Sequence, residues 1–489
     1  MRWLAAILVL LLLGPTAHAE TVGSKKFTEG VILGEIARIA IAKAGVPVDH
    51  RRELGGSRIV FDAVKAGEID VYPEYTGTLR FEILASDRLP GDAAIGAALA
   101  RQGLALSRPL GFSNGYALAM RADVAKRGGI RSISDLARHG GLTIAVSNEF
   151  VDRADGWRAL AAAYRMGTIP VRGIDHDLAY RALSAGQIDV TDVYTTDAEI
   201  AAHNLIVLID DRQFFPRYDA VFVYRRDLDP RAVAALNRLA GTIDEARMQQ
   251  LNRMVRLDGA TETAAAQAAL GKTAPTTQRQ SDGRRQRIAR STVEHLQLVL
   301  IALGAALLVA VPLGILAARR PRVGAFVLPL TGLLQTIPSL ALFVMLIPLL
   351  GIGAAPTVAA LFLYSLLPIV RNTHAGLAGI APSLIDSAEA LGLSRLARLR
   401  RIELPLALPT IIAGVRTAAV IAVGLATLGA IIGAGGYGQP ILTGIRLGNT
   451  GLILEGAIPA ALMALTIEGL FHLAERVLTP RGLTPSPRR

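Results

Sequence analysis

The sequence contains no cysteine, so neither a disulfide nor a thiolate metal site can form, and this absence is compatible with any cellular compartment. The eight histidines are scattered without the spacing of a zinc site, and no G-x-x-x-x-G-K-[ST] phosphate-binding loop occurs. No catalytic pair of residues stands out. The net charge of +12 lacks an accompanying platform of basic and aromatic residues, which argues against nucleic-acid binding. We therefore expect no metal site, no catalytic residues and no nucleic-acid partner.

Hydrophobic residues are present in abundance but are unevenly distributed. They make up 52% of the 489 residues, which indicates a membrane protein at least in part, with two or three domains. Mixed charges and turn residues occupy positions 21 to about 290, whereas long apolar runs fill positions 296–473. The chain thus divides into a polar half and a membrane half.

The N-terminus has the layout of a secretory signal peptide. Arg2 precedes an apolar run over residues 4–13, and Ala17 and Ala19 form a small-x-small cleavage site. We expect residues 1–19 to be removed by the signal peptidase, with an uncleaved anchor as the alternative. Either outcome exports the polar half that follows.

The membrane half contains five apolar segments, each close to the roughly 20 residues that cross a hydrocarbon core. If each segment crosses, arginine clusters at 319–322, 395–401 and 476–489 share one side, which the positive-inside rule makes cytoplasmic. A cluster at 284–290 falls on the outer side, where a long exported domain weakens the rule. Prolines and glycines within several segments favour either a solute pathway or kinked, tightly packed helices. The five segments lie near 296–317, 325–350, 356–380, 410–433 and 452–473.

A polar interruption between the third and fourth segments has the Ala, Leu and Gly spacing of a helix-turn-helix. It resembles the coupling loop of ABC importer permeases, which docks on a cytoplasmic ATPase, although that family begins the loop with Glu-Ala-Ala. The resemblance implies that Gly392 permits the turn and that Pro405 closes the second helix. The alternative is an ordinary basic loop between spans. The matching residues are Asp386, Ser387, Ala388, Gly392, Ile402, Leu404 and Pro405.

The same resemblance implies the partners of the chain. Because the chain has no phosphate-binding loop, a separate ABC ATPase subunit is expected to bind and hydrolyse ATP, and no cofactor is expected in this chain. One chain supplies one coupling loop, so we expect the permease half to form a homodimer in the bacterial cytoplasmic (inner) membrane. The segment 335–343 also resembles the second span of osmoprotectant permeases.

A repeated pattern, A-G-x-I-D-V-x-x-x-Y-T, organises the polar half. It begins at Ala66 and again 119 residues later at Ala185. Each copy predicts a helix end capped by Gly67 or Gly186, then a short Ile-Asp-Val strand, then a turn that presents a tyrosine.

Amphipathic helices alternate with these strands, which predicts an α/β architecture with two similar lobes that face a cleft. The alternative is a purely structural repeat in which Tyr75 and Tyr194 are core residues. The expected helices lie near 29–44, 58–65 and 178–183.

Nearly the whole polar half resembles the substrate-binding proteins for glycine betaine, choline, carnitine and proline betaine. The resemblance implies a two-lobed, type II-like periplasmic-binding-protein fold of α/β class, followed by an all-α polytopic transmembrane domain of an ABC importer. The segments that carry it lie at 22–29, 54–57, 72–78, 114–120, 149–156, 192–197 and 210–218.

In that family, tyrosines from both lobes form a box around a quaternary ammonium group. Such a group is bulky and cannot donate conventional hydrogen bonds, so aromatic faces attract it by cation–π contact, at about 0.5–2 kcal/mol per ring. Position by position, the resemblance places Tyr75, Tyr116, Tyr194 and Tyr218 in this box.

For a zwitterionic ligand, the resemblance assigns Lys25 and Arg153 to the carboxylate, helped by Thr78, and places Asn114 in the same site. The alternative for either basic residue is a surface salt bridge, since most charged side chains are solvated.

Two departures from the family bear on affinity. Gly30 stands where the family often has glutamine, which removes a side-chain amide from the cleft. Some members also have a further tyrosine between the first two box positions, and the stretch 77–114 contains none here.

The sequence therefore predicts a substrate-binding and permease subunit of an ATP-driven importer for quaternary ammonium osmoprotectants. One alternative is a fused amino-acid importer subunit, whose cleft would need an acidic residue for the α-amino group. Another is a sensor that signals without transport and needs no coupling loop. The expected domains are a signal peptide (1–19), a binding domain (20–270), a linker (271–290), a permease domain (291–480) and a cytoplasmic tail (481–489).

Overall fold

The computed structural model describes residues 19–167, 169–271 and 280–478. The chain divides into two compact units, residues 1–275 and 276–489. Residues 1–18 of the predicted signal peptide (1–19), residues 272–279 of the predicted linker and the predicted tail lie outside the described residues. The rest of the predicted linker, from residue 280 on, is part of helix α15(Gln280–Arg319).

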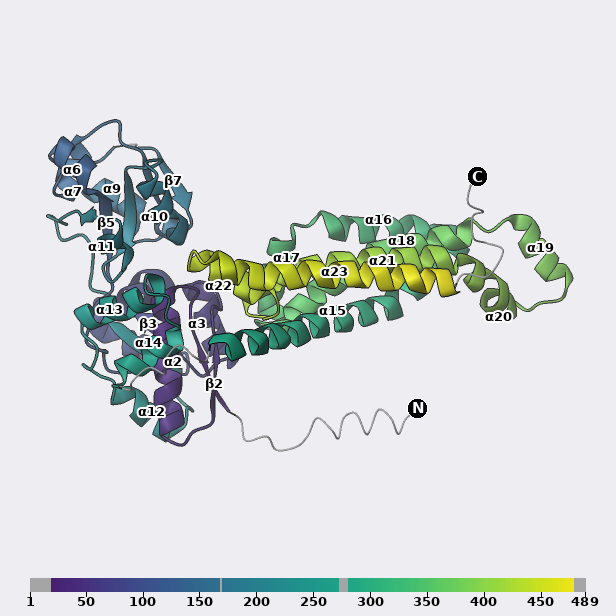
Figure 1. Ribbon diagram of the computed structural model, residues 1–489, viewed down its shortest axis with the longest axis horizontal. Helices are drawn as coiled ribbons and strands as arrows, with labels where there is room; N and C mark the ends of the chain where they lie inside the picture. Colours follow the sequence, from purple (N-terminus) through teal and green to yellow (C-terminus); the bar gives the residue numbers. More distant parts are fainter. Residues whose placement is uncertain (1–18, 168, 272–279, 479–489) are drawn as a thin grey trace. The chain divides into compact units, whose positions relative to one another are not determined.

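The first unit contains two five-stranded mixed sheets of matching topology (Figure 1). In each sheet three neighbouring strands are parallel, and the fourth is antiparallel to the strand on either side of it. The structure thus confirms the predicted two-lobed α/β fold. The first sheet has the order β2(Val48–Arg51), β1(Glu20–Gly23), β3(Val71–Tyr75), β10(Ala220–Arg225), β4(Leu104–Leu106). The second has the order β7(Val171–Ile174), β6(Ile144–Ser147), β8(Val190–Tyr194), β5(Tyr116–Arg121), β9(Leu205–Val207).

Helices connect these strands, and three of them were expected within one or two residues of their observed ends. These three are α2, α3 and α10. The helices of the first unit are α2(Thr28–Lys43), α3(Ser57–Ala66), α4(Thr76–Thr78), α5(Ile95–Ala100), α6(Ala122–Gly128), α7(Ile133–Arg138), α8(Asn148–Asp152), α9(Trp157–Ala163), α10(His176–Ser184), α11(Glu199–Ala202), α12(Pro230–Asn237), α13(Glu245–Arg256) and α14(Glu262–Ala269).

The repeated glycines do the same work in both lobes. Gly67 follows α3 with φ +78°, and Gly186 lies just beyond the end of α10 with φ +71°. That left-handed backbone is strained for any residue with a Cβ. An added Cβ would also lie 2.5 Å from the Arg225 guanidinium at Gly67 and 3.1 Å from that of Arg121 at Gly186.

The repeated aspartates fix the neighbouring strand in each sheet. Asp70 Oδ2 accepts a 2.8 Å hydrogen bond from the backbone N–H of Thr21, and Asp189 Oδ2 accepts one of the same length from Thr143. The prediction placed these aspartates inside Ile-Asp-Val strands. In the structure they lie just before β3 and β8, which begin one residue later.

The predicted tyrosine turns are therefore wrong in detail. β3 and β8 extend further than expected, and Tyr75 and Tyr194 are their last residues. Because the carboxyl ends of parallel strands form the ligand-binding edge of open α/β sheets, both rings lie where a ligand is expected.

Two chain segments cross between the lobes side by side. The N–H of Asn114 donates to the carbonyl of Tyr218 at 3.0 Å, and the N–H of Ala220 donates to the carbonyl of Phe112 at 3.1 Å. Tyr218 thus lies on the hinge itself, between the two sheets.

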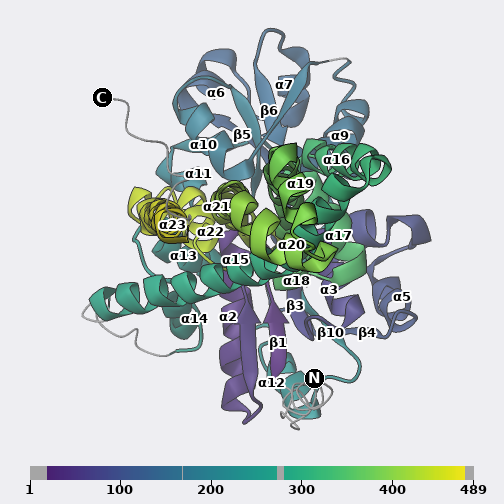
Figure 2. The same ribbon diagram turned by 90° about the vertical axis from the view of Figure 1, so that its right-hand side faces the viewer.

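The second unit is helical. Among its described residues, four helical stretches are long and apolar enough to cross a membrane, and the bent pair α16–α17 adds a fifth crossing if it counts as one span. Figures 1 and 2 show the two short helices α19 and α20 together at one end of the bundle. The helices are α15(Gln280–Arg319), α16(Pro321–Thr336), α17(Ser339–Leu350), α18(Ala354–Ala378), α19(Pro382–Ala390), α20(Arg395–Arg398), α21(Leu404–Ala426), α22(Gly438–Arg446) and α23(Thr450–Leu478).

The second predicted span, 325–350, is not one straight helix, because α16 and α17 meet at an angle of 99°. Pro338 at the break has no N–H to continue the helical ladder. The Tyr364 hydroxyl donates to the carbonyl of Ile337 at the break, and the side-chain amide of Gln335 donates to the Tyr364 carbonyl at 2.9 Å. Hydrogen bonds from neighbouring side chains therefore stabilise the break.

Glycines let the central helix α18 pack closely between two neighbours. An added Cβ at Gly314 of α15 would lie 3.0 Å from the Val370 carbonyl oxygen, and one at Gly414 of α21 would lie 2.7 Å from that of Pro368. Small residues at such contacts are the usual means by which membrane helices approach one another.

Three of the four arginines before the first span, which conflicted with the expected topology, have acidic partners. Arg287 pairs with Glu455 of α23 at 3.0 Å, Arg284 approaches the same carboxylate at 3.4 Å, and Arg290 pairs with Glu294 at 2.7 Å. These ion pairs offset much of the positive charge at this end of α15.

Candidate ligand-binding site and coupling loop

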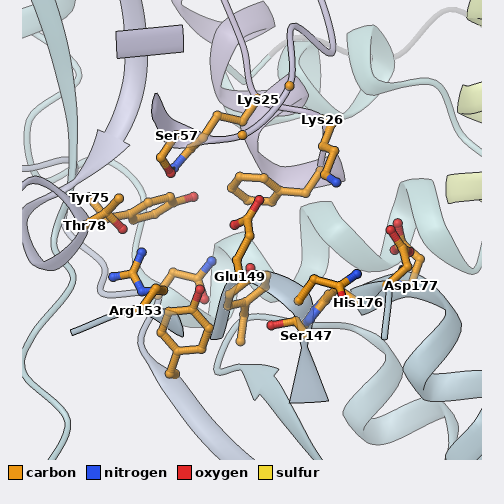
Figure 3. A pocket seen from close by; sticks show the side chains of 18 of the residues that line it. Lys25, Lys26, Ser57, Tyr75, Thr78, Ser147, Glu149, Arg153, His176 and Asp177 are labelled. Carbon is orange, nitrogen blue, oxygen red and sulfur yellow. Dashed lines mark hydrogen bonds between the residues drawn. The ribbon is translucent and has the colours of Figure 1, made fainter. Parts of the chain in front are cut away.

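A cavity in the first unit lies between the two lobes and is lined by residues from both, as well as by the hinge (Figure 3). Lys25, Ser57 and Tyr75 border one side of it, whereas Arg153, Glu149 and His176 border the opposite side. All eight predicted ligand-binding residues line this cavity. They are Lys25, Tyr75, Thr78, Asn114, Tyr116, Arg153, Tyr194 and Tyr218.

Aromatic rings form a continuous wall along the cavity. The ring centroid of Tyr116 lies 5.1 Å from that of Tyr194 and 5.7 Å from that of Tyr218, and the second pair is edge to face. Phe27 joins the lobes, because its centroid lies 6.2 Å from Tyr75 and 5.9 Å from Tyr194. Such spacings are those of packed aromatic pairs, so the five rings hold one another in place.

Two of the tyrosine hydroxyl groups donate to buried carboxylates behind the rings. Tyr75 donates to Glu29 Oε1 at 2.6 Å, and Tyr218 donates to Asp155 Oδ2 at 2.5 Å. Burial raises the pKa of all four box tyrosines above its ordinary value, so the phenols stay neutral at physiological pH. The cavity therefore presents uncharged aromatic faces.

The two predicted cations are buried and already paired. Lys25 Nζ lies 2.5 Å from Glu74 Oε1, and Arg153 donates to both oxygens of Asp155 at 2.8 and 2.7 Å and also contacts Glu82. The alternative of surface salt bridges is wrong, since Lys25 and Arg153 are only 6% and 8% exposed. A ligand carboxylate would have to share these donors with the protein's own carboxylates.

Thr78 and Asn114 are buried at the edge of the cavity. The Asn114 side-chain amide donates to Glu29 Oε1 at 2.9 Å, and its carbonyl oxygen accepts from the N–H of Thr196 at 3.4 Å. Asn114 thus ties the hinge to both lobes in addition to bordering the site.

His176 is a cavity residue that the sequence did not reveal. Its ring stacks on Tyr194 with centroids 4.2 Å apart, and its Nε2 lies 3.0 Å from Asp197. Burial alone would lower its pKa, but the carboxylates of Asp197, Asp192 and Asp177 raise it to about 9. His176 is consequently an imidazolium at neutral pH.

The predicted coupling loop is a helix-turn-helix at one end of the second unit. α19 and α20 are joined by a turn in which Gly392 has φ +73°, the left-handed region that favours glycine. Asp386 and Ser387 are exposed, whereas Ala388 is buried against the rest of the loop. An exposed, ordered turn of this kind offers a docking surface.

Pro405 does not close the second helix as predicted. The chain runs as one helical stretch from Arg395 to Ile432, and Pro405 lies inside it, at the start of α21 and just after a turn of π-helix over Leu399–Glu403. Glu403 just before it pairs with Arg398 of α20 at 2.6 Å and with Arg319 of α15 at 3.1 Å. Ile402 and Leu404 are half-buried beside it. These ion pairs and the continuous helix connect the loop to the spans α15 and α21.

Comparison with known proteins decides the family. Residues 21–272 match the substrate-binding domain of ABC-type glycine betaine transport systems, OpuAC. Residues 310–482 match the inner membrane component of binding-protein-dependent transport systems. The chain belongs to the OpuAC family, fused to an ABC permease domain.

Curated relatives match the permease domain. The osmoprotectant import permease protein OsmW of Salmonella typhimurium is 44% identical over 201 residues, which cover 40% of this chain and 94% of that protein. The choline transport system permease protein OpuBB of Bacillus subtilis is 42% identical over 192 residues, covering 39% and 88%. A crystal structure of a glycine betaine/carnitine/choline ABC transporter covers 52% of this chain and 97% of its own, with 26% identity and a TM-score of 0.45.

This OpuAC–permease fusion is a transporter subunit rather than an enzyme, and the ATPase of such systems is a separate subunit. The matched permease family and the apolar helices make it a multi-pass inner-membrane protein that carries its own binding domain.

Phe27 of the binding domain is a second cavity residue that the sequence left unassigned. An added Cβ at Gly30, one turn later, would lie 3.2 Å from the Phe27 ring, so the glycine leaves room for that ring. Phe27 lies within the matching segment 22–29, and an aromatic residue in that segment was the available signal. Phe27 is the fifth aromatic ring of the wall, beside the four predicted tyrosines.

Proposed function

We propose that the binding domain captures a quaternary ammonium osmoprotectant, such as choline, glycine betaine or carnitine, and passes it to the permease domain for ATP-driven import. The observation that carries this proposal is the wall of five neutral aromatic rings around a cavity between two lobes. A trimethylammonium group gains cation–π attraction from such faces and needs no hydrogen-bond acceptor.

The charges around the cavity support a ligand with a positive end. Glu74 offsets Lys25, and Asp155 and Glu82 offset Arg153. Glu149, Asp175 and Asp177 add carboxylates to the lining, beside Lys26 and the His176 imidazolium, which pairs with Asp197. A region with paired cations and further acidic groups attracts a cationic head more strongly than an anionic one. We propose that Lys25 and Arg153, with Thr78, still orient the carboxylate of a betaine by sharing their donors.

The proposal extends to the assembly. The loop α19–α20 would dock on the separate ATPase, and two copies of the permease domain would pair so that the complex has two such loops. Support comes from the exposed turn at Gly392 and from the presence of one loop per chain.

Titration calorimetry on the purified full-length chain tests the ligand class. We expect choline, glycine betaine or carnitine to bind, and glutamine and arginine not to bind. Binding of an amino acid in place of all three quaternary ammonium compounds would favour the amino-acid importer instead. Binding without any ATP-dependent uptake in the presence of the ATPase would favour the sensor.

A further inference from the structure

Glu29 is a buried carboxyl group that lies behind the residues lining the cavity. It occupies the first turn of α2 and is only 2% exposed. It is not part of the cavity lining, yet Tyr75 and Asn114, which are, both donate hydrogen bonds to it. Glu29 therefore touches the site only through other residues.

Four uncharged donors surround this carboxylate. Tyr75 Oη and Asn114 Nδ2 donate to Oε1 at 2.6 and 2.9 Å, whereas Thr196 Oγ1 and Asn252 Nδ2 donate to Oε2 at 2.5 and 2.8 Å. A carboxylate has about four acceptor positions, so this arrangement suits the ionised form. The pKa of Glu29 is raised overall, because burial outweighs the hydrogen bonds from Thr196, Tyr75 and Asn252 that lower it.

Two buried carboxylates beside the cavity, Glu74 and Asp155, are matched by cations, whereas Glu29 is not. Lys25 neutralises Glu74, and Arg153 neutralises Asp155. Among the residues that the structure describes, no lysine, arginine or histidine forms an ion pair with Glu29. Its charge is supported instead by the N-terminus of the 16-residue helix α2. A carboxyl group without a cationic partner thus lies directly behind the Tyr75 ring.

We propose that Glu29 is a positioning residue that gives the aromatic box its selectivity for charge. By accepting the Tyr75 hydroxyl proton in a hydrogen bond, Glu29 makes that ring more electron-rich and fixes its orientation. Its own charge adds attraction for a cation on the other side of the ring. Both effects act on a trimethylammonium group and leave a neutral group of the same shape nearly unaffected. This inference rests on the proposed function, since it presumes a quaternary ammonium ligand.

The test compares choline with its neutral carbon isostere, 3,3-dimethylbutan-1-ol, on the purified full-length chain carrying Glu29→Gln. Competition with radiolabelled choline gives both dissociation constants. We expect choline to bind at least about tenfold more weakly, equivalent to about 1.4 kcal/mol, while the isostere changes less than about twofold. The substitution keeps the side-chain shape, and the Thr196 hydroxyl can rotate to accept from the new amide. A turn of the Asn252 amide would instead give up its 3.0 Å bond to the Thr196 carbonyl.

Two further variants complete the test. Glu35→Gln is the matched control, because Glu35 is equally buried on α2 but pairs with Arg38, His50 and Arg52, which do not line the cavity. We expect it to leave both affinities unchanged. Should Glu29→Gln fail to fold, Tyr75→Phe keeps the ring, removes its bond to Glu29 and is expected to weaken choline alone.

The outcomes separate the two proposals. An equal loss of choline and isostere would show a merely structural role for Glu29 and overturn the inference, as would an unchanged affinity for choline. If the wild-type chain binds no quaternary ammonium compound at all, the proposed function fails first, and the inference falls with it.

Discussion

Tyr194 packs against rings from both lobes. Its ring lies against Phe27 and Tyr116 and stacks on His176. We predict that Tyr194→Ala weakens quaternary ammonium binding by about tenfold or more, because it removes one cation–π face and loosens the rings beside it. We predict the same for Tyr75→Ala. Calorimetric titration of each variant measures the change.

Tyr224 provides the control for these variants. It lies on β10 of the same domain and does not line the cavity, so Tyr224→Ala should keep the wild-type affinity. Wild-type affinity in both the Tyr75 and Tyr194 variants would instead refute the aromatic box.

His176 makes the stability of the binding domain depend on pH. Its folded-state pKa of about 9 lies above the ordinary 6.5, so its contribution is full below pH 6.5 and is lost as the pH rises through 9. We predict a loss of roughly 2–3 kcal/mol in the free energy of unfolding over this interval. Urea titration followed by the fluorescence of Trp157, a buried residue of this domain, measures it.

The His176→Gln variant serves as the reference for that measurement. It should be less stable at pH 6.5 and should lose much less stability toward pH 9 than the wild type. An identical slope in both proteins would show that another group is responsible.

The sequence located the box tyrosines because a repeat and several matching segments surround them, but it did not reveal His176 or the pairing of Lys25. A single histidine carries no pattern of its own. Its stacking on Tyr194 and its contact with Asp197 arise only when the second lobe folds. The burial and the partners of a single charged residue depend on tertiary structure. They therefore could not be predicted from the sequence.

At the scale of elements, the coupling loop depends on a backbone angle that glycine adopts easily. Gly392 has φ +73°, and open space surrounds it, so a substitution there acts through backbone strain of about 1–2 kcal/mol rather than through a clash. We predict that Gly392→Val impairs ATP-dependent uptake with the partner ATPase while ligand binding stays intact. Uptake and calorimetry on the same preparation measure both.

Gly304→Ala is the control for the loop variant. Gly304 is a helical glycine of α15 that also faces open space but has no left-handed backbone, so uptake should be unchanged. Full transport by Gly392→Val would refute the assignment of α19–α20 as the coupling loop.

Element types were predicted better than element boundaries. Hydrophobic runs indicated the helices of the permease domain, because length and apolar character are visible in the sequence. The 99° break at Pro338 and the passage of one helix through Pro405 were not foreseen. Proline is compatible with a break, a first turn or a kink, and neighbours such as Tyr364 decide among them.

At the scale of the whole molecule, covalent fusion keeps a binding domain beside its permease. A tether typically gives an effective concentration in the millimolar range, so even a weak docking interface would be occupied. We predict that the complete transporter contains two copies of this chain and two ATPase subunits, since one chain supplies one loop. Native mass spectrometry of the complex counts the subunits. A single copy of the chain, or a pairing with a different permease, would contradict the homodimer.

The most direct test of the account is uptake of radiolabelled choline into proteoliposomes that contain the chain and its ATPase. We predict ATP-dependent uptake by the wild type, and at subsaturating choline a reduction of about tenfold or more in the Tyr194→Ala variant, because capture in the aromatic box limits import at that concentration. Undiminished uptake by the variant, or import of glutamine or arginine in place of quaternary ammonium compounds, would contradict the account.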